Sequence, residues 1–186
     1  MTLAETASIM NETIVTDAAL AQAAGAEEEL AILETFLLNS SQVIVDIYSR
    51  YLFETEVFQR REEAELSADD FCEMMSRAQK ETYAEALDPQ QLHPYMWTWK
   101  PHYYIPSLSF YNFPYAFGLL FGLGLYAIYQ ERGADFLQDY DALLRSTGEG
   151  TAAELAARFD IDLKQPAFWQ GSMKVIEGRI DRYVAL

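Results

Sequence analysis

The stretch that decides the fold runs from residue 110 to residue 132 and reads FYNFPYAFGLLFGLGLYAIYQER. It predicts one helix from about Phe110 to Arg132, which Gly133 ends. Pro114 falls near the first turn of this helix, where a missing backbone N–H is tolerated. Three glycines lower the helix propensity of the stretch: Gly118, Gly122 and Gly124. We expect them to allow the close approach of a neighbouring helix.

The same stretch also raises the question of a membrane span. From Pro101 to Gln130 the sequence contains no Asp, Glu, Lys or Arg. Such a run is either a transmembrane helix or a helix buried within a helical protein. Its Leu/Phe/Gly-rich part, Phe117 to Ile128, is shorter than the roughly 20 residues that a bilayer requires. We therefore expect a buried helix and no membrane partner.

The rest of the chain is also helical in pattern. Helices are expected over residues 3–24, from residue 27 to about 54, and over 67–86, 134–145 and 167–184, with a short helix after Thr151. Ser67 with Asp70, and Thr151 with Glu154, have the spacing of capping boxes.

Between these helices, residues 90–109 predict an ordered loop packed by Trp97 and Trp99. The last helix is expected to turn four apolar residues inward: Phe168, Met173, Ile176 and Ile180. No strand-period run and no linker is evident. The sequence therefore predicts an all-α, multi-helix bundle that forms a single helical domain over residues 1–186.

Composition excludes several classes of function. Thirteen Lys and Arg against 29 Asp and Glu give a net charge of −16, which repels phosphate backbones and excludes nucleic acid as a partner. Cys72 is the only cysteine, so an intrachain disulfide and a multi-cysteine metal site are both excluded. The N-terminus lacks a basic region followed by an apolar run, so we expect no secretory signal and a cytoplasmic location.

One histidine and two tyrosines are candidates for chemistry. His102 lies nine residues before Tyr111, and Tyr111 and Tyr115 are four apart, so on a helix both hydroxyls project from one face. A histidine and two phenols that converge are hydrogen-bond donors suited to a developing oxyanion. The alternative for all three residues is aromatic packing around a buried helix.

Two glutamates near the N-terminus share one side of a helix. Glu5 and Glu12 are seven residues apart, which is two helical turns. Without further context, Glu5 is an ordinary solvated glutamate. The chain has only two histidines, His93 and His102, and they are nine apart, whereas a helical zinc peptidase site needs two histidines one turn apart plus a carboxylate. No complete zinc site can be built from this sequence.

Three segments carry a resemblance to a known family. They read LAETASIMNE from residue 3, HYYIPSLSFYNFPYAFG from residue 102 with GLLFGLGLYAIY continuing it, and LLRSTGEGTAAELAARFDIDLKQPAFWQGSMKVIEGRIDRY from residue 143. In this order they resemble the oligoendopeptidase F and thimet-oligopeptidase group of zinc metallopeptidases. The resemblance covers essentially the whole chain.

The resemblance implies roles for five residues. Glu5 matches the third zinc ligand, and Glu12 matches an acidic residue that holds a ligand histidine by a hydrogen bond. His102 matches the histidine that faces the substrate carbonyl. Tyr111 and Tyr115 match the tyrosines whose hydroxyls stabilise the tetrahedral intermediate. The spacing leaves open which tyrosine does so.

The resemblance also implies an activity. The complete enzyme would be a hydrolase that cleaves short peptides with a zinc-activated water. This chain resembles the C-terminal part of its gluzincin-type catalytic domain without the HExxH segment. We therefore expect the chain alone to hold no cofactor and to be inactive. Its expected partners are short peptides, the missing N-terminal portion of the peptidase, and a second copy bound through exposed apolar faces.

Two other classes of function stay open. The first is a non-catalytic helical peptide-binding or interaction protein derived from such a peptidase. The second is a membrane-associated helical protein built around Pro101 to Gln130.

Overall fold

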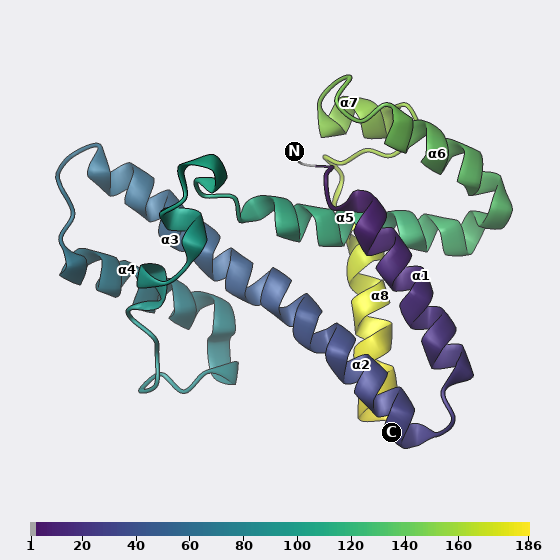
Figure 1. Ribbon diagram of the computed structural model, residues 1–186, viewed down its shortest axis with the longest axis horizontal. Helices are drawn as coiled ribbons and strands as arrows, with labels where there is room; N and C mark the ends of the chain where they lie inside the picture. The colour runs from purple at the N-terminus through teal and green to yellow at the C-terminus, as the bar shows by residue number, and fades with distance from the viewer. Residues whose placement is uncertain (1–2) are drawn as a thin grey trace. The chain divides into compact units, whose positions relative to one another are not determined.

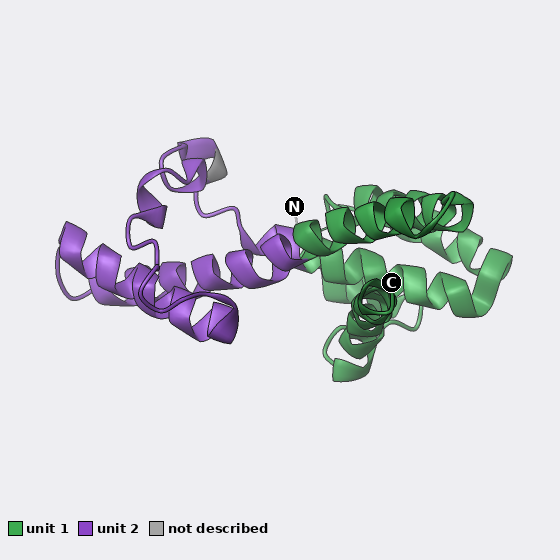
Figure 2. Ribbon diagram, turned by 90° about the horizontal axis from the view of Figure 1, so that it is seen from below, with its two compact units in different colours: residues 1–40, 117–186 green, residues 41–116 purple. Residues whose placement is uncertain are grey.

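The computed structural model describes residues 3–186, apart from the side chain of Leu108 (Figure 1). Within that range all regular structure is helical, which confirms the all-α prediction. The chain forms two compact units, residues 1–40 with 117–186 and residues 41–116 (Figure 2). The expectation of a single domain over residues 1–186 stays a prediction.

Unit 1 is built around the long apolar helix that ends before Gly133. Its helices are α1 (Thr6–Gln22), α2 (Ala26–Ser41), most of α5 (Phe113–Arg132), α6 (Leu137–Arg145), α7 (Ala152–Ala157) and α8 (Pro166–Val184). Phe121, Leu123 and Leu125 of α5 are fully buried. Figure 1 shows α1 and α8 lying against α5, which therefore carries the core of this unit.

The glycines of α5 permit this packing, as the sequence predicted. A Cβ atom at Gly122 would lie 2.6 Å from Cγ2 of Ile9 in α1. At Gly124 it would collide with the ring of Phe168 in α8. Two helices therefore approach α5 at positions where any larger side chain would hold them away.

Unit 2 is a smaller helical unit. It contains a π-helical turn η1 (Gln42–Asp46), α3 (Ile47–Arg61), α4 (Ala68–Tyr83), the short 3₁₀ turns η2 (Ala84–Ala86), η3 (Met96–Thr98), η4 (Pro101–Tyr103) and η5 (Pro106–Leu108), and the start of α5. Helices α3 and α4 pack together through five buried residues: Phe53, Val57, Met74, Met75 and Ala78. Ser67 and Asp70 form the predicted capping box at the start of α4, and Thr151 and Glu154 form the one before α7.

Two predicted helix limits were wrong. The second predicted helix does not end near Glu54 but continues through η1 and α3 to Arg61, because Val57 is still buried in the core. Helix α5 begins at Phe113 rather than Phe110, because Phe110 has a φ of +54°, outside the helical region.

Two predicted core residues of the long loop behave differently. Trp97 packs against Phe71 with ring centroids 5.1 Å apart, as predicted. Trp99 is 59% exposed and carries the ammonium of Lys100 over its ring, 4.1 Å from the centroid. The prediction that Trp99 packs the loop was therefore wrong, and one face of its exposed ring covers the buried Lys100 instead.

The inward face of α8 was also only partly predicted. Ile176 is buried, whereas Met173 and Ile180 are about half exposed. Their place is taken by Arg179, whose guanidinium lies 3.8 Å from the ring centroid of Phe36 and pairs with Asp17 at 2.8 Å. A paired cation can occupy an interior position, which apolar periodicity does not reveal.

One continuous helix among the described residues, Ala26–Arg61, has the length and apolar composition of a membrane span. It differs from the stretch considered above, and it contains the ion pair of Asp46 with Arg50. Core helices of soluble proteins meet the same criteria, so the finding alone does not make this helix a span. The absence of a membrane partner stays a prediction.

Adding one methyl group at Gly122 should destabilise the fold. Gly122→Ala places a Cβ against both Cβ and Cγ2 of Ile9, and the overpacking should lower the free energy of unfolding by about 1–3 kcal/mol. The matched control is Gly178→Ala in α8, where a Cβ meets nothing within 4 Å and should stabilise by about 0.5–1 kcal/mol. Urea unfolding of both variants measures this, and equal stabilities would contradict the close packing of α1 on α5.

Candidate functional site

Unit 2 brings together three of the residues that the sequence singled out. Nε2 of His102 lies 3.2 Å from the hydroxyl oxygen of Tyr115. The ring of Tyr111 meets that of Tyr115 edge to face, with centroids 5.3 Å apart. The histidine and both phenols therefore form one group, which we call the His–Tyr group. Their catalytic roles stay predictions.

A strained turn places His102 beside the start of α5. The backbone N–H of Phe110 donates to the carbonyl oxygen of His102 at 2.9 Å, while Phe110 holds a left-handed φ of +54°. Its ring is packed between Phe58 and Tyr103, at centroid distances of 4.7 and 5.5 Å. This packing holds a backbone conformation that is unfavourable for a bulky residue, and residues 102–110 fold back as a result.

A set of buried polar residues supports the His–Tyr group. This buried polar cluster consists of Asp46, Arg50, Glu54, Lys100 and Asn112, each at most 7% exposed. Asn112 is fully buried and directly follows Tyr111; its side chain accepts from Nη1 of Arg50 at 3.0 Å and donates to Glu54.

The remaining members of the cluster are ion-paired. Arg50 pairs with Asp46, and Nζ of Lys100 lies 3.6 Å from the same carboxylate. Asn112 bridges Arg50 and Glu54, two charged residues of α3, and this bridge fixes the start of α5.

Burial within this region shifts several pKa values. The pKa of Glu54 is raised to about 7 because burial penalises its charged form, against the effects of the Tyr103 hydroxyl, the hydrogen bond from Asn112 and the charge of Arg50. The pKa of His102 is lowered, mainly by burial and then by the positive charges of Arg50 and Lys100. Both effects favour the neutral form of the imidazole.

The sequence pattern did not predict that these five polar residues gather in the interior. Two signals in the sequence point to it: Asp46 and Arg50 stand four apart in an otherwise apolar helical segment, and Asn112 is the only amide side chain between Pro101 and Tyr129. The partners of Asn112, however, are Arg50 and Glu54, which lie far away in sequence. Periodicity carries no information about such partners.

Glu5 and Glu12 lie in unit 1. Glu5 is half-buried at the start of α1, and its side chain makes no capping hydrogen bond. It lies against α5 at Gly118, where an added Cβ would be 2.5 Å from the Cβ of Glu5. Glu12 is exposed and lines a groove of about 380 Å³ between α1 and α2. The roles of both carboxylates as metal ligand and ligand support stay predictions.

The described residues do not supply a set of donors that fits zinc. Nowhere in residues 3–186 do three or more His, Cys, Asp or Glu side chains gather where they could hold one metal ion. A tetrahedral zinc site needs three or four protein ligands. His93, the second histidine, is tied by its backbone N–H and carbonyl oxygen to the side chain of Gln79.

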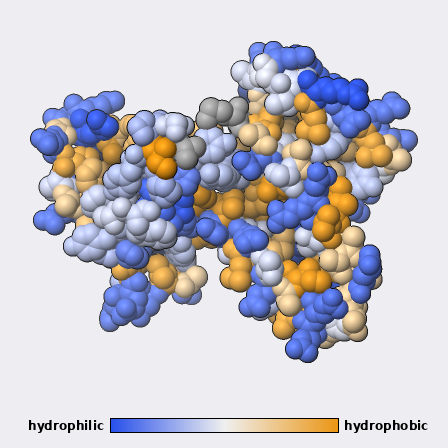
Figure 3. All heavy atoms as spheres, viewed as in Figure 1, coloured by the Kyte–Doolittle hydropathy of each residue, from blue (hydrophilic) through white to orange (hydrophobic). Residues whose placement is uncertain are grey.

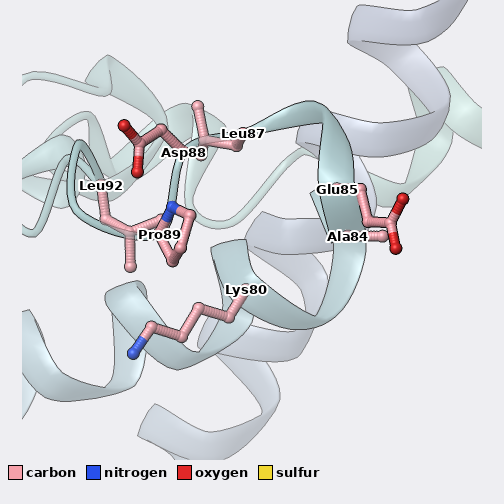
Figure 4. Close-up of a pocket in the computed structure, with 7 residues that line it drawn as sticks. All are labelled: Lys80, Ala84, Glu85, Leu87, Asp88, Pro89 and Leu92. Carbon is pink, nitrogen blue, oxygen red and sulfur yellow. The ribbon is translucent and has the colours of Figure 1, made fainter.

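A further pocket of unit 2 lacks convergent chemistry. It measures about 500 Å³ and lies beside the C-terminal end of α4, where its lining includes Lys80, Glu85 and Asp88 (Figure 4). Figure 4 shows the two carboxylates pointing away from each other, at opposite sides of the pocket. The His–Tyr group is therefore the better candidate site.

Comparisons with known proteins give one match. The model of peptidase family M3 matches residues 1–175. No curated protein and no solved structure matches the chain. The matched range includes Glu5, Glu12 and the whole His–Tyr group.

Neutralising Glu54 should change how stability depends on pH. Its pKa is about 7 in the folded chain against an ordinary 4.5, so between these values the folded chain binds more protons than the unfolded chain. The free energy of unfolding should therefore fall as the pH rises through this window, by about 3 kcal/mol in all.

Glu54→Gln removes this titration and should flatten the profile over the same window. Urea unfolding at intervals between pH 4.5 and 7.5 measures both proteins. An unchanged slope in the variant would show that another group carries the dependence.

Proposed function

Because the chain belongs to peptidase family M3, we propose that it forms one wall of a peptide-hydrolysing site. In this proposal His102, Tyr111 and Tyr115 of unit 2 face the substrate, and Glu5 of unit 1 supplies a metal-ligand carboxylate. The observation that carries the proposal is the His–Tyr group itself, because it gathers three side chains with polar hydrogens within a sequence range that the family model matches.

The chemistry of the His–Tyr group suits the stabilisation of a developing negative charge. When water adds to a peptide carbonyl, charge builds on the oxygen only as the transition state is approached. A phenol fixed beforehand at that position assists the transition state more than the bound substrate. The buried polar cluster supplies this fixation through Asn112, which anchors the first turn of α5.

The metal of such a site would need ligands beyond this stretch of chain. Glu5 is a single carboxylate, and the described residues contain no set of three donors. We propose that the remaining ligands come from the portion of a peptidase that carries HExxH, and that residues 1–186 neither retain zinc nor cleave peptides alone. No catalytic step through the metal is assigned to this chain.

The proposal extends to substrate and location. We propose short peptides as substrates, following the oligoendopeptidase resemblance, because a channel between helices excludes folded proteins. We propose a cytoplasmic location. Exposed apolar side chains such as Val15, together with the apolar atoms visible among hydrophilic ones in Figure 3, support self-association of the isolated chain.

A second candidate function is peptide binding without catalysis. The observation that favours it is the lack of a metal donor set among the described residues. A protein of this kind keeps the peptide-facing side chains of the family but has no means of activating water. The two functions differ in whether zinc and an HExxH portion restore hydrolysis.

Zinc retention tests the first part of the proposal. Purified chain, loaded with zinc and then desalted, should contain far less than one zinc per molecule, because a lone carboxylate does not hold the ion against water. Elemental analysis measures the content. One tightly held zinc per chain, lost on Glu5→Gln, would contradict the proposal.

Hydroxyl deletion tests the second part. In the complete enzyme, Tyr111→Phe or Tyr115→Phe removes a donor and keeps the ring, so kcat should fall on the order of 10²-fold for the tyrosine that acts, with little change in KM or zinc content. Steady-state kinetics with a short peptide substrate measure this. Full activity in both variants would leave peptide binding or packing as the role of these residues.

A further inference from the structure

Two buried carboxylates of unit 2 have unequal partners. Asp46 and Glu54 are both 6% exposed. Asp46 pairs with Arg50 and lies 3.6 Å from Nζ of Lys100, so two cations compensate its charge. Glu54 accepts a hydrogen bond from the side-chain amide of Asn112. None of the ion pairs among residues 3–186 includes it.

A buried carboxylate without an ion pair favours its neutral form. Taking the ionised group out of water costs more than one neutral hydrogen-bond donor returns, so the group takes up a proton instead. The raised pKa of Glu54, about 7, agrees with this geometry. Above that pH the side chain carries a charge that its surroundings do not pair.

Two residues that precede α5 cover the Glu54 carboxyl. Asn112 is fully buried and donates to it. Tyr103 packs its ring against Phe53 and Phe110, at centroid distances of 5.6 and 5.5 Å. Its hydroxyl acts on Glu54 and is buried without a hydrogen-bond partner among the described residues. We call residues 103–112 the covering segment.

The other charged groups nearby do not pair with Glu54. Arg50 stands one turn before it on α3, but its guanidinium is engaged by Asp46 and by Oδ1 of Asn112. Helix α4 faces α3 with apolar side chains. The remaining titratable groups lie around Asp46 and Arg50 instead: Tyr83 of α4, and Lys100 and His102 of the loop.

We propose that Glu54 is a pH-sensitive switch beneath the covering segment. While its carboxyl is neutral, it stays buried under Tyr103 and Asn112. When it ionises, the unpaired charge is stabilised by water, and the covering segment opens so that water reaches it. The segment joins His102 to Tyr111, so its opening separates the His–Tyr group. The consequence for activity rests on the proposed function.

The direction of the pH dependence separates this switch from a titration of His102. Because the pKa of Glu54 is raised under the covering segment, its ionisation favours the open state as the pH rises. The pKa of His102 is lowered, mainly by burial, so its protonation favours the open state as the pH falls. The two groups therefore act in opposite directions between pH 6 and pH 8.

Amide hydrogen exchange of the full chain tests the switch. Protection, corrected for the intrinsic pH dependence of exchange, is followed at the N–H of Phe110, which donates to the His102 carbonyl oxygen. Between pH 6 and pH 8 this amide should lose about tenfold more protection in the unmodified chain than in Glu54→Gln. The factor follows from a pKa of about 7 in the covered state against 4.5 in water.

Two further variants complete the test. Glu62→Gln, an exposed glutamate at the end of α3, is the matched control and should behave like the unmodified chain. Tyr103→Phe keeps the ring but removes the hydroxyl that lowers the pKa of Glu54, so the loss of protection should move to higher pH.

Three results would overturn the proposal. The first is an equal change of protection in the unmodified chain and in Glu54→Gln. The second is an equal loss at the amide of Ala78 in α4, which would show that unit 2 unfolds as a whole. The third is a loss of protection that moves to lower pH in Tyr103→Phe. If exchange behaves as expected but Glu54→Gln leaves the pH–activity profile of the complete enzyme unchanged, the switch stands and the proposed function fails.

Discussion

The requirement that buried charge be paired holds unit 2 together. Arg50 is almost fully buried, and its guanidinium reaches Asp46 on one side and Asn112 on the other. Removing one member of such a buried pair typically costs about 3–5 kcal/mol, because the other charge stays in a place that water does not reach. The π-helical turn, α3 and the first turn of α5 are therefore tied to each other by one side chain. The His–Tyr group inherits its position from this arrangement.

Unit 1 depends on a different constraint, the absence of a side chain at two glycines of α5. Gly118 and Gly122 of α5 let Glu5 and Ile9 of α1 rest directly on its backbone. The stem of the Glu5 side chain is thus placed by its close contact with the backbone at Gly118. One candidate residue is held by shape and the others by charge, so different kinds of substitution are needed to displace them.

The sequence predicted most of the helices because their amphipathic patterns and capping boxes are local. The box at Ser67 and the glycines of α5 are examples in which neighbouring residues carry all the information. It did not predict the inward-facing Arg179, the exposed ring of Trp99, or the bridge made by Asn112. Each of these depends on a partner distant in sequence or on a cation beside an aromatic ring, which a periodic pattern does not encode. His102 and the tyrosines were predicted to converge from motif and spacing, but the pairing of His102 with Tyr115 depends on the turn at Phe110.

The ion pair between Asp17 and Arg179 joins residues 162 positions apart, and unit 1 as a whole is assembled from residues 1–40 and 117–186. Unit 2 is continuous in sequence. During synthesis the ribosome therefore completes unit 2 while residues 117–186, the larger part of unit 1, have yet to be translated. Closing so long a loop slows folding. The apolar faces of α1 and α2 stay exposed until α8 has left the ribosomal exit tunnel. The order of translation thus leaves α1 and α2 without their packing partner α8 for longer than any helix of unit 2 is left without its own.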